Sequence, residues 1–440
     1  MEYKMNEFES MSDVAVEDGM KKIREFARTI RKEDYRNKTV VFLADGMADE
    51  PLPELAGKTP VEAVDTPCLD SIALKGASGT FLTLPEGFPT SSDAANMSVM
   101  GYSLAQFYPG RGPIEAESQG IELKEDDIAW RCNVVYAEGG KEGILRDYSA
   151  GHISNEISSR LIADLKKHFD SDKVTFHPGV SYRNLLVLHG KEFSSNVDYY
   201  KPDSSQDIAV KDLPYTALDD SKEAAHTVAF INDLVSRASE FLAAHPLNQN
   251  VKSPANMIWP WSPGKKPSFT SFTEKYEGKT GAVISAVDVI KGIAKCAKMD
   301  VIEVPGATGF TDTDYEGKAL AALKALKDHD MVYLHVEAID ECSHLGDLQQ
   351  KMFAISQFEN RLVKPVMEAL EGCDVTFAIL PDHPVPIHER AHTRTPVPVA
   401  VCGKNIPADK VKKYGESFVG EGALGAMSGE DFMRLVLGLK

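Results

Sequence analysis

Three short apolar runs, each leading to an aspartate, are the feature of this sequence that most constrains its fold. Runs of about four to eight mostly β-branched or aromatic residues between helical patterns predict buried parallel strands. Open α/β sheets place their functional groups outside the carboxyl ends of such strands, so the polar residues that follow are expected to face one cleft. The runs and these polar residues are 40–44 with Asp45, 332–336 with Asp340 and His344, and 375–380 with Asp382 and His383.

Length and composition narrow the class of protein. A chain of 440 residues exceeds one ordinary core and predicts two domains, and its apolar share of 43% is typical of a globular enzyme. The net charge of −18 argues against a nucleic-acid or membrane-surface partner. No stretch approaches the length of a membrane span, and no signal-peptide core is visible. The 6 scattered cysteines contain no CxxC pair, so we expect free thiols and a cytoplasmic protein.

The pattern along the chain predicts three parts. Residues 1–37 form an extension in which Met20, Ile23, Ala27 and Ile30 have helical spacing, so we expect an amphipathic helix lying on the body of the protein or on another copy in a homo-oligomer.

Strands and helices then alternate over 38–123 and again over 274–440, which predicts one α/β core. Between them, 124–273 has a different pattern and is expected to be an inserted domain. Its last segment, 256–267, is dense in Pro, Gly and Trp and predicts an ordered connector.

The polar residues at the strand ends suit a two-metal site. Asp340 and His344 lie one turn apart if their segment is helical, so both can point at one ion. Each pair alone is a weak signal, but the conjunction of three carboxylates with His344, His383 and His392 matches a site for manganese, magnesium, cobalt or zinc. Ser91, Ser92 and Asp93 occupy a predicted strand-to-helix turn, where a serine lies in the positive field of the helix N-terminus.

From residue 38 onward the sequence resembles the archaeal-type, cofactor-independent phosphoglycerate mutases of the alkaline phosphatase superfamily. The resemblance rests on many ordered motifs. They are Asp45-Gly-Met-Ala-Asp49, Ser92-Asp93, Gly110-Arg-Gly-Pro-Ile-Glu-Ala116, Arg131-Cys-Asn133, Asp147-Tyr-Ser-Ala-Gly-His152, Tyr182-Arg-Asn-Leu-Leu186, Pro305-Gly-Ala-Thr-Gly309, Asp340-Glu-Cys-Ser-His344 and Asp382-His383. The extension at residues 1–37 lies outside the resemblance.

The resemblance implies a fold, a reaction and a set of metal ligands. The fold is an alkaline-phosphatase-like α/β core with a mostly parallel sheet and an inserted α/β domain that covers the substrate. The reaction is the interconversion of 2- and 3-phosphoglycerate in glycolysis through a phosphoserine, with Ser92 as nucleophile and Ser91 as its rival. One of two divalent ions, with manganese favoured, is expected on Asp340, His344 and His392, and the other on Asp45, Ser92, Asp382 and His383.

Candidate groups for the phosphorylated substrate lie in the family-like motifs. Arginine's planar fork fits carboxylate and phosphate, and Arg111 and Arg183 are the best candidates because their neighbours are uncharged. The other candidates are Arg131, Arg146, His152, Lys291 and Lys318.

Two departures from the family pattern keep an alternative open. The family commonly has glycine before the serine and histidine near the position of Asn96, whereas this chain has Ser91 and Asn96. The segments Asp382-His-Pro-Val-Pro-Ile387 and Arg390-Ala-His-Thr-Arg394 are closer to a branch proposed to phosphorylate homoserine. A homoserine kinase-like phosphotransferase is therefore the alternative enzyme, and a metal-bearing protein without catalysis is the alternative of a different class.

Overall fold

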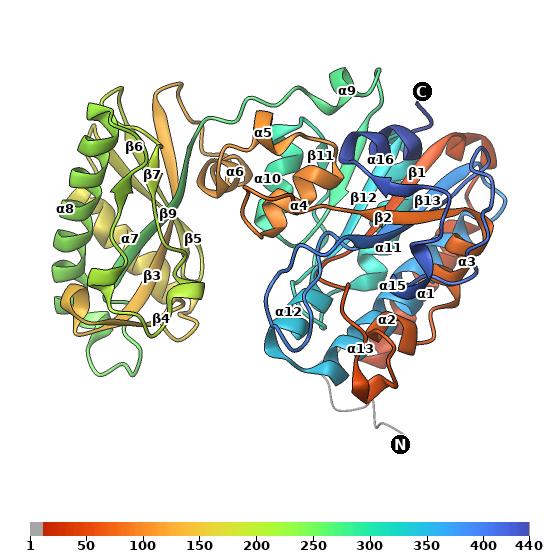
Figure 1. Cartoon of the computed structure of the whole chain (residues 1–440), viewed down its shortest axis with the longest axis horizontal. Helices are drawn as coiled ribbons and strands as arrows, with labels where there is room; N and C mark the ends of the chain where they lie inside the picture. Colours follow the sequence, from red (N-terminus) through yellow and green to blue (C-terminus); the bar gives the residue numbers. More distant parts are fainter. Residues whose placement is uncertain (1–11, 440) are drawn as a thin grey trace. The chain divides into compact units, whose positions relative to one another are not determined.

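The computed structural model describes residues 12–439 and divides the chain into two compact units (Figure 1). The core unit comprises Met1–Tyr108 and Phe269–Lys440, and the inserted unit comprises Pro109–Ser268. Within the described residues, no helix is both long and apolar enough to cross a membrane. The 6 cysteines are free, as expected.

An eight-stranded sheet in the order β11-β10-β12-β1-β13-β14-β2-β15 organises the core unit. Neighbours from β11 to β13 pair in parallel, whereas β14 runs antiparallel to both of its neighbours. The expected mostly parallel α/β sheet is thus confirmed. The strands are β1 (Lys38–Ala44), β2 (Ala77–Phe81), β10 (Gly281–Ile284), β11 (Asp300–Val301), β12 (Met331–Val336), β13 (Val375–Leu380), β14 (Val397–Cys402) and β15 (Gly425–Met427).

Helices cover both faces of this sheet (Figure 1). The main apolar core lies on one face and includes Val40, Phe42, Val332 and Leu334. Its helices are α1 (Asp13–Ala27), α3 (Pro67–Lys75), α11 (Tyr315–Asp328), α12 (Ala338–Leu345), α13 (Leu348–Gln357) and α14 (Lys364–Ala369). On the other face are α4 (Ser92–Val99), α10 (Asp288–Cys296) and α16 (Gly429–Val436). The short helices of this unit are α2 (Pro60–Ala63), α5 (Leu104–Phe107), α9 (Phe272–Lys275) and α15 (Glu416–Val419).

Two segments of the core unit differ in detail from their sequence patterns. The apolar pattern at 301–304 predicts a strand, but β11 ends at Val301 and a turn follows at 304–307, where Ala307 N–H donates to the Val304 carbonyl. The pattern over 349–370 predicts one helix, but the structure has α13, a π-helical turn (Phe358–Val363) and α14. Pro365 has no amide N–H to donate and therefore interrupts the regular hydrogen-bond ladder.

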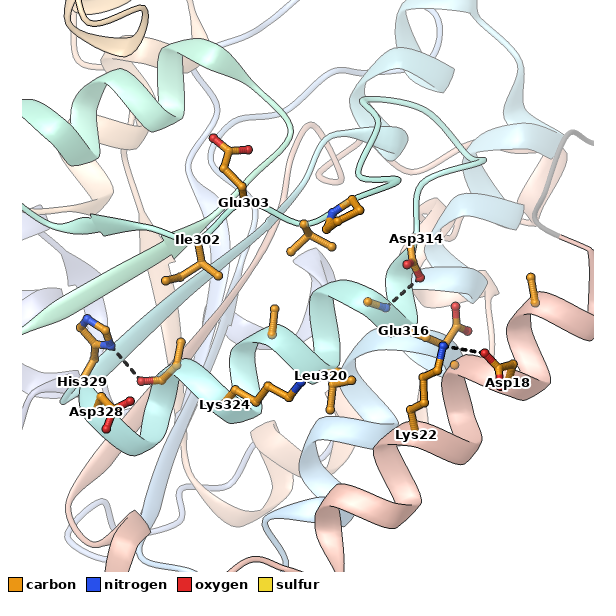
Figure 2. A pocket seen from close by; sticks show the side chains of 17 residues that line it. Asp18, Lys22, Ile302, Glu303, Asp314, Glu316, Leu320, Lys324, Asp328 and His329 are labelled. Carbon is orange, nitrogen blue, oxygen red and sulfur yellow. Dashed lines mark hydrogen bonds and ion pairs between the residues drawn. The ribbon is translucent and has the colours of Figure 1, made fainter.

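The predicted amphipathic helix of the extension is α1, which packs on the core unit. Ile23 is buried, and Gly19 allows close approach, since a Cβ there would lie 2.5 Å from Cβ of Glu316. Beside α1 and α11 lies a cavity of about 650 Å³ lined by Lys22, Asp314, Leu320 and others (Figure 2). None of the residues predicted for the functional site lines this cavity.

An antiparallel sheet forms the inserted unit, with α7 and α8 packed on one face (Figure 1). Its strands are β3 (Asp127–Glu138), β4 (Ile144–Asp147), β5 (Val174–Val180), β6 (Arg183–His189) and β9 (Met257–Lys265), with a separate pair, β7 (Val197–Asp198) and β8 (Thr216–Ala217). Its helices are α6 (Arg111–Ser118), α7 (Asn155–Phe169) and α8 (Lys222–Ala244).

The boundaries of the inserted unit differ from the expected 124–273. It begins earlier because α6 packs against β3 and β9, and Arg111 N–H donates to Ser262 Oγ over 2.9 Å. The prediction of a connector at 256–267 was wrong, because most of that segment is the buried strand β9. Pro260 and Pro263 made the segment look unlike a strand, because prolines are uncommon in strands. The strand β9 accepts them because it pairs with β3 alone among the described strands.

Candidate metal centre

The predicted ligands come together because β12, β1 and β13 are adjacent parallel strands. Leu43 of β1 is in register with His335 of β12 and with Leu380 of β13, so the three carboxyl ends meet at one edge. Asp45 follows β1, Asp382 follows β13, and α12 begins directly beyond β12. Carboxylates from three distant parts of the sequence therefore lie at the same edge of the sheet.

Ser92 faces this cluster from α4. It is the first residue of the helix, and its Oγ lies 3.1 Å from Nε2 of His383. The N-cap is Ser91, whose side chain makes no capping bond and whose buried Oγ has no hydrogen-bond partner among the described residues. Ser91 has φ −154°, which any residue adopts, so the chain does not need the family's glycine there. Of the two serines, Ser92 is the one in contact with a predicted ligand.

Asp45, Asp382 and His383 form the first ligand group. Nε2 of His383 lies 3.4 Å from Asp45 Oδ1 and 3.4 Å from Asp382 Oδ2, and all three side chains are buried. Their potential ligand atoms lie within 4.8 Å of one another.

Asp340, His344 and His392 form the second group. The predicted helix is α12, and it places His344 Nε2 3.3 Å from Asp340 Oδ2. His392 Nε2 lies 2.9 Å from His344 Nε2 and 3.5 Å from Asp340 Oδ1. The rings of His392 and His383 stack with their centroids 3.7 Å apart, so the two groups adjoin.

The electrostatics of these groups suit a cation. Burial, reinforced by the charges of Asp382 and Asp340, raises the pKa of Asp45 well above its ordinary value. Burial also opposes ionisation of Asp340, but the hydrogen bond from His344 and the charge of His392 hold its pKa well below the ordinary value. Asp45 Oδ1 and Asp340 Oδ1 are buried and accept no hydrogen bond within the described residues. Buried carboxylates need a charged partner, so oxygen and imidazole donors here fit divalent metal ions.

Sequence reasoning missed the side chains that support these ligands. Tyr333 O–H donates to Asn96 Oδ1 over 2.6 Å, and Asn96 Nδ2 donates to Asp382 Oδ2 and to the Ser92 carbonyl, each over 2.8 Å. Asn96, at the position where the family commonly has histidine, thus links α4, which carries Ser92, to the predicted ligand Asp382.

His335 is a second such residue. Its Nε2 lies 3.0 Å from Asp45 Oδ2, and the ring is fully buried. Burial, with the charge of Lys318, lowers the pKa of His335 to about 3, so the ring is neutral. Polar side chains at alternate positions of an otherwise apolar strand, Tyr333 and His335, were the available signal.

Three of the predicted substrate arginines gather in the inserted unit around Glu115. Arg111 Nε lies 2.7 Å from Glu115 Oε1, and the buried Arg131 pairs with the same oxygen. Burial alone would raise the pKa of Glu115, but Arg131 and Arg111, with a smaller contribution from Arg183, lower it below the ordinary value. Burial lowers the pKa of Arg131 to about 10, so it stays cationic at neutral pH. Guanidinium groups bind carboxylate and phosphate, so Arg111, Arg131 and Arg183 stay candidates for contact with an anionic substrate.

The other predicted substrate residues differ in their surroundings. His152 belongs to an aromatic cluster with Tyr148 and Tyr182, and Arg183 lies over the Tyr182 ring at 5.1 Å. Arg146, in contrast, pairs with two carboxylates at the surface, Glu138 and Asp207.

Two lysines lie in the core unit rather than with the arginines. Lys291 lies on α10 and pairs with Glu303 over 3.0 Å. Lys318 is fully buried and donates to the His335 carbonyl over 3.3 Å, and burial lowers its pKa to about 8.

Comparison with known proteins identifies the family. The family model described as 2,3-bisphosphoglycerate-independent phosphoglycerate mutase matches residues 73–248. A protein of that name from Methanosarcina acetivorans is 44% identical over 407 residues, which cover 91% of this chain and 99% of the relative. A Geobacter sulfurreducens protein, described as a probable enzyme of this kind, is 42% identical over 408 residues, with 91% and 99% covered.

Solved structures agree in fold. A Pyrococcus horikoshii protein superposes with a TM-score of 0.75 at 26% identity, covering 92% of this chain and 97% of that one. The cofactor-independent phosphoglycerate mutase of Thermoplasma acidophilum has a TM-score of 0.61 at 23% identity, with 91% and 99% covered. Because the relatives are this similar over nearly their whole length, the chain belongs to the 2,3-bisphosphoglycerate-independent phosphoglycerate mutase family.

Proposed function

We propose that this protein interconverts 2-phosphoglycerate and 3-phosphoglycerate through a phosphoserine on Ser92, without 2,3-bisphosphoglycerate. The observation that carries the proposal is the position of Ser92 Oγ, 3.1 Å from Nε2 of His383, a residue that belongs to two clusters of side chains that could hold a metal ion. A serine hydroxyl is a weak nucleophile at neutral pH and needs such surroundings to react.

The residues present fit two divalent ions. Asp340, His344 and His392 would hold one, and Asp45, Ser92, Asp382 and His383 the other. Manganese is favoured, with magnesium, cobalt or zinc as alternatives for mixed oxygen and imidazole donors. When bound, such ions supply positive charge that favours the serine alkoxide and neutralises the phosphoryl oxygens.

The reaction would consist of two phosphoryl transfers, the first from the substrate to Ser92 and the second from Ser92 back to glycerate. Ser92 Oγ forms a bond to phosphorus while the bond from phosphorus to the glycerate oxygen breaks. The other hydroxyl of glycerate then attacks the phosphoserine, and the Ser92 oxygen leaves. The free amides of the first turn of α4 favour the negative charge that Ser92 carries in the intermediate.

The arginines of the inserted unit would bind the anionic substrate. Arg111, Arg131 and Arg183 all act electrostatically on Glu115, and a guanidinium can bind a carboxylate in a bidentate manner. We keep His152 and Lys291 as weaker candidates. Arg146 is the weakest, because two carboxylates already pair with it.

The kinase-type alternative uses the same metal ligands with a nucleotide donor. The family match and the curated relatives described above are mutases, which favours the mutase. We further propose a cytoplasmic location, in keeping with the small phosphorylated substrate and the free cysteines.

The test uses the purified full chain with manganese. We expect conversion of 3-phosphoglycerate to 2-phosphoglycerate in the absence of 2,3-bisphosphoglycerate and of nucleotide, with loss of activity on chelation. Homoserine with ATP is the comparison reaction. Strict ATP dependence with homoserine as acceptor would replace the mutase by the kinase.

A further inference from the structure

Three side chains at the ends of adjacent strands form a continuous hydrogen-bonded row in the core unit. Ile284 of β10 is in register with Leu334 of β12, and Leu43 of β1 is in register with His335. Ser285, His335 and Asp45 are therefore placed side by side across three strands. Ser285 Oγ lies 3.0 Å from His335 Nδ1, and His335 Nε2 lies 3.0 Å from Asp45 Oδ2.

The hydrogen bonds assign the protons in this row. The backbone N–H of Val287 donates to Ser285 Oγ over 3.0 Å, so the serine oxygen already accepts one bond. His335 Nδ1 is the only acceptor in contact with the Ser285 hydroxyl among the described residues. A neutral imidazole with an accepting Nδ1 carries its proton on Nε2, and this N–H then donates to Asp45.

This arrangement makes the two oxygens of Asp45 unequal. Oδ2 accepts from His335, whereas Oδ1 lies 3.4 Å from His383 Nε2 and accepts no hydrogen bond within the described residues. We propose that Ser285 and His335 are positioning residues, which hold Asp45 so that Oδ1 points to the divalent metal. The inference rests on the proposed function, because it assumes that Asp45 is a metal ligand.

The location of His335 supports a role beyond filling space. Its apolar neighbours Leu334 and Val336 point into the main core, while His335 lies on the other face with Tyr333. Groups that hydrogen-bond to metal ligands fix their orientation, and losing one typically weakens metal binding about 10- to 100-fold.

Two substitutions separate the bond to Asp45 from the bond to Ser285. In His335→Gln the amide nitrogen can occupy the place of Nε2 and still donate to Asp45. In His335→Asn the shorter amide reaches only the place of Nδ1, near Ser285. Mn²⁺ affinity is measured without substrate, from the electron paramagnetic resonance signal of free Mn²⁺ during titration of the full chain.

We expect His335→Asn to lose about tenfold or more in Mn²⁺ affinity at one of the two sites, and His335→Gln to stay within about threefold of the unsubstituted protein at both. His329→Asn is the matched control, because His329 also contacts an aspartate, Asp300 at 2.8 Å, but lies outside the site. Its affinity should not change. Equal affinities in both His335 variants, unchanged or equally reduced, overturn the inference.

Ser285→Ala keeps the test decisive if His335→Asn does not fold. It leaves the ring in place but removes the bond that selects the tautomer, so we expect a loss of Mn²⁺ affinity clearly larger than that of His335→Gln. Unchanged affinity in Ser285→Ala would overturn the role of the row. If the unsubstituted protein itself binds no Mn²⁺, the proposed function fails, which is a distinct result from equal binding by all variants.

Discussion

Ser92 Oγ lies 3.1 Å from His383 Nε2, whereas the neighbouring Ser91 Oγ is buried without a hydrogen-bond partner among the described residues. Ser92→Ala should therefore lose about three or more orders of magnitude in mutase rate, the scale expected when a nucleophile is deleted. Acid-quenched enzyme mixed with 3-phosphoglycerate should carry phosphate on Ser92 by mass spectrometry.

Ser91 provides the control for this prediction. Because its backbone is extended, Ser91→Gly should fold and retain activity. Phosphate mapped to Ser91, or retained turnover in Ser92→Ala, would contradict the assignment of the nucleophile.

Removal of a metal ligand should abolish activity with little effect on folding. Asp340→Ala removes a buried carboxylate that faces two histidines, and His344→Ala removes one of those histidines. We expect no detectable turnover in either variant, together with a circular dichroism spectrum like that of the unsubstituted protein. Full turnover in a chelated, metal-free sample would rule out the metal centre.

Metal binding should strengthen as the pH rises. Burial opposes protonation of His344, but its hydrogen bond to Asp340 outweighs burial and raises its pKa to about 9 in the metal-free protein. A metal must displace this proton, so the apparent metal affinity should rise by up to about tenfold for each unit of pH increase, until the pH reaches about 9. Activity should accordingly fall below about pH 6. Titration calorimetry in buffers of different ionisation enthalpy measures the proton released. Binding without proton release at pH 7.5 would contradict the prediction.

The sequence predicted that the three aspartates lie together, but it did not predict the side chains that contact them. Asp45, Asp340 and Asp382 follow strands whose apolar pattern is strong, and a parallel sheet necessarily brings such strand ends to one edge. The partners of these aspartates depend on register between distant strands, which a single sequence does not specify. The contact of His335 with Asp45 and that of Asn96 with Asp382 therefore emerged only from the structure.

The inserted unit shows a second limit. The strand β9 (Met257–Lys265) was taken for a connector because prolines are depleted in strands, and only its pairing with β3 reveals an edge position that accepts them. Likewise, α6 belongs to the inserted unit through its packing against β3 and β9, and no change in composition at residue 109 marks that boundary.

The last prediction concerns stability, through the partly buried Glu416 at the start of α15. Its Oε1 accepts from Asp49 N–H over 3.0 Å and its Oε2 accepts from the Thr59 hydroxyl over 2.6 Å, yet burial outweighs these bonds and raises its pKa from 4.5 to about 7. Between these two values the folded protein binds a proton that the unfolded chain has released, so this residue makes the protein less stable as the pH rises from 4.5 to 7.

Glu416→Gln removes this titration. The free energy of unfolding of the variant, relative to the unsubstituted protein, should increase between pH 5 and pH 8 by up to about 3 kcal/mol. Thermal unfolding followed at both pH values measures the difference, and the exposed Glu371→Gln controls for the loss of one negative charge. As the pH rises, the thermal unfolding midpoint of Glu416→Gln should increase relative to that of the unsubstituted protein, because only the unsubstituted protein must ionise a partly buried carboxyl group. A constant difference across this range would mean that Glu416 ionises normally in the folded protein.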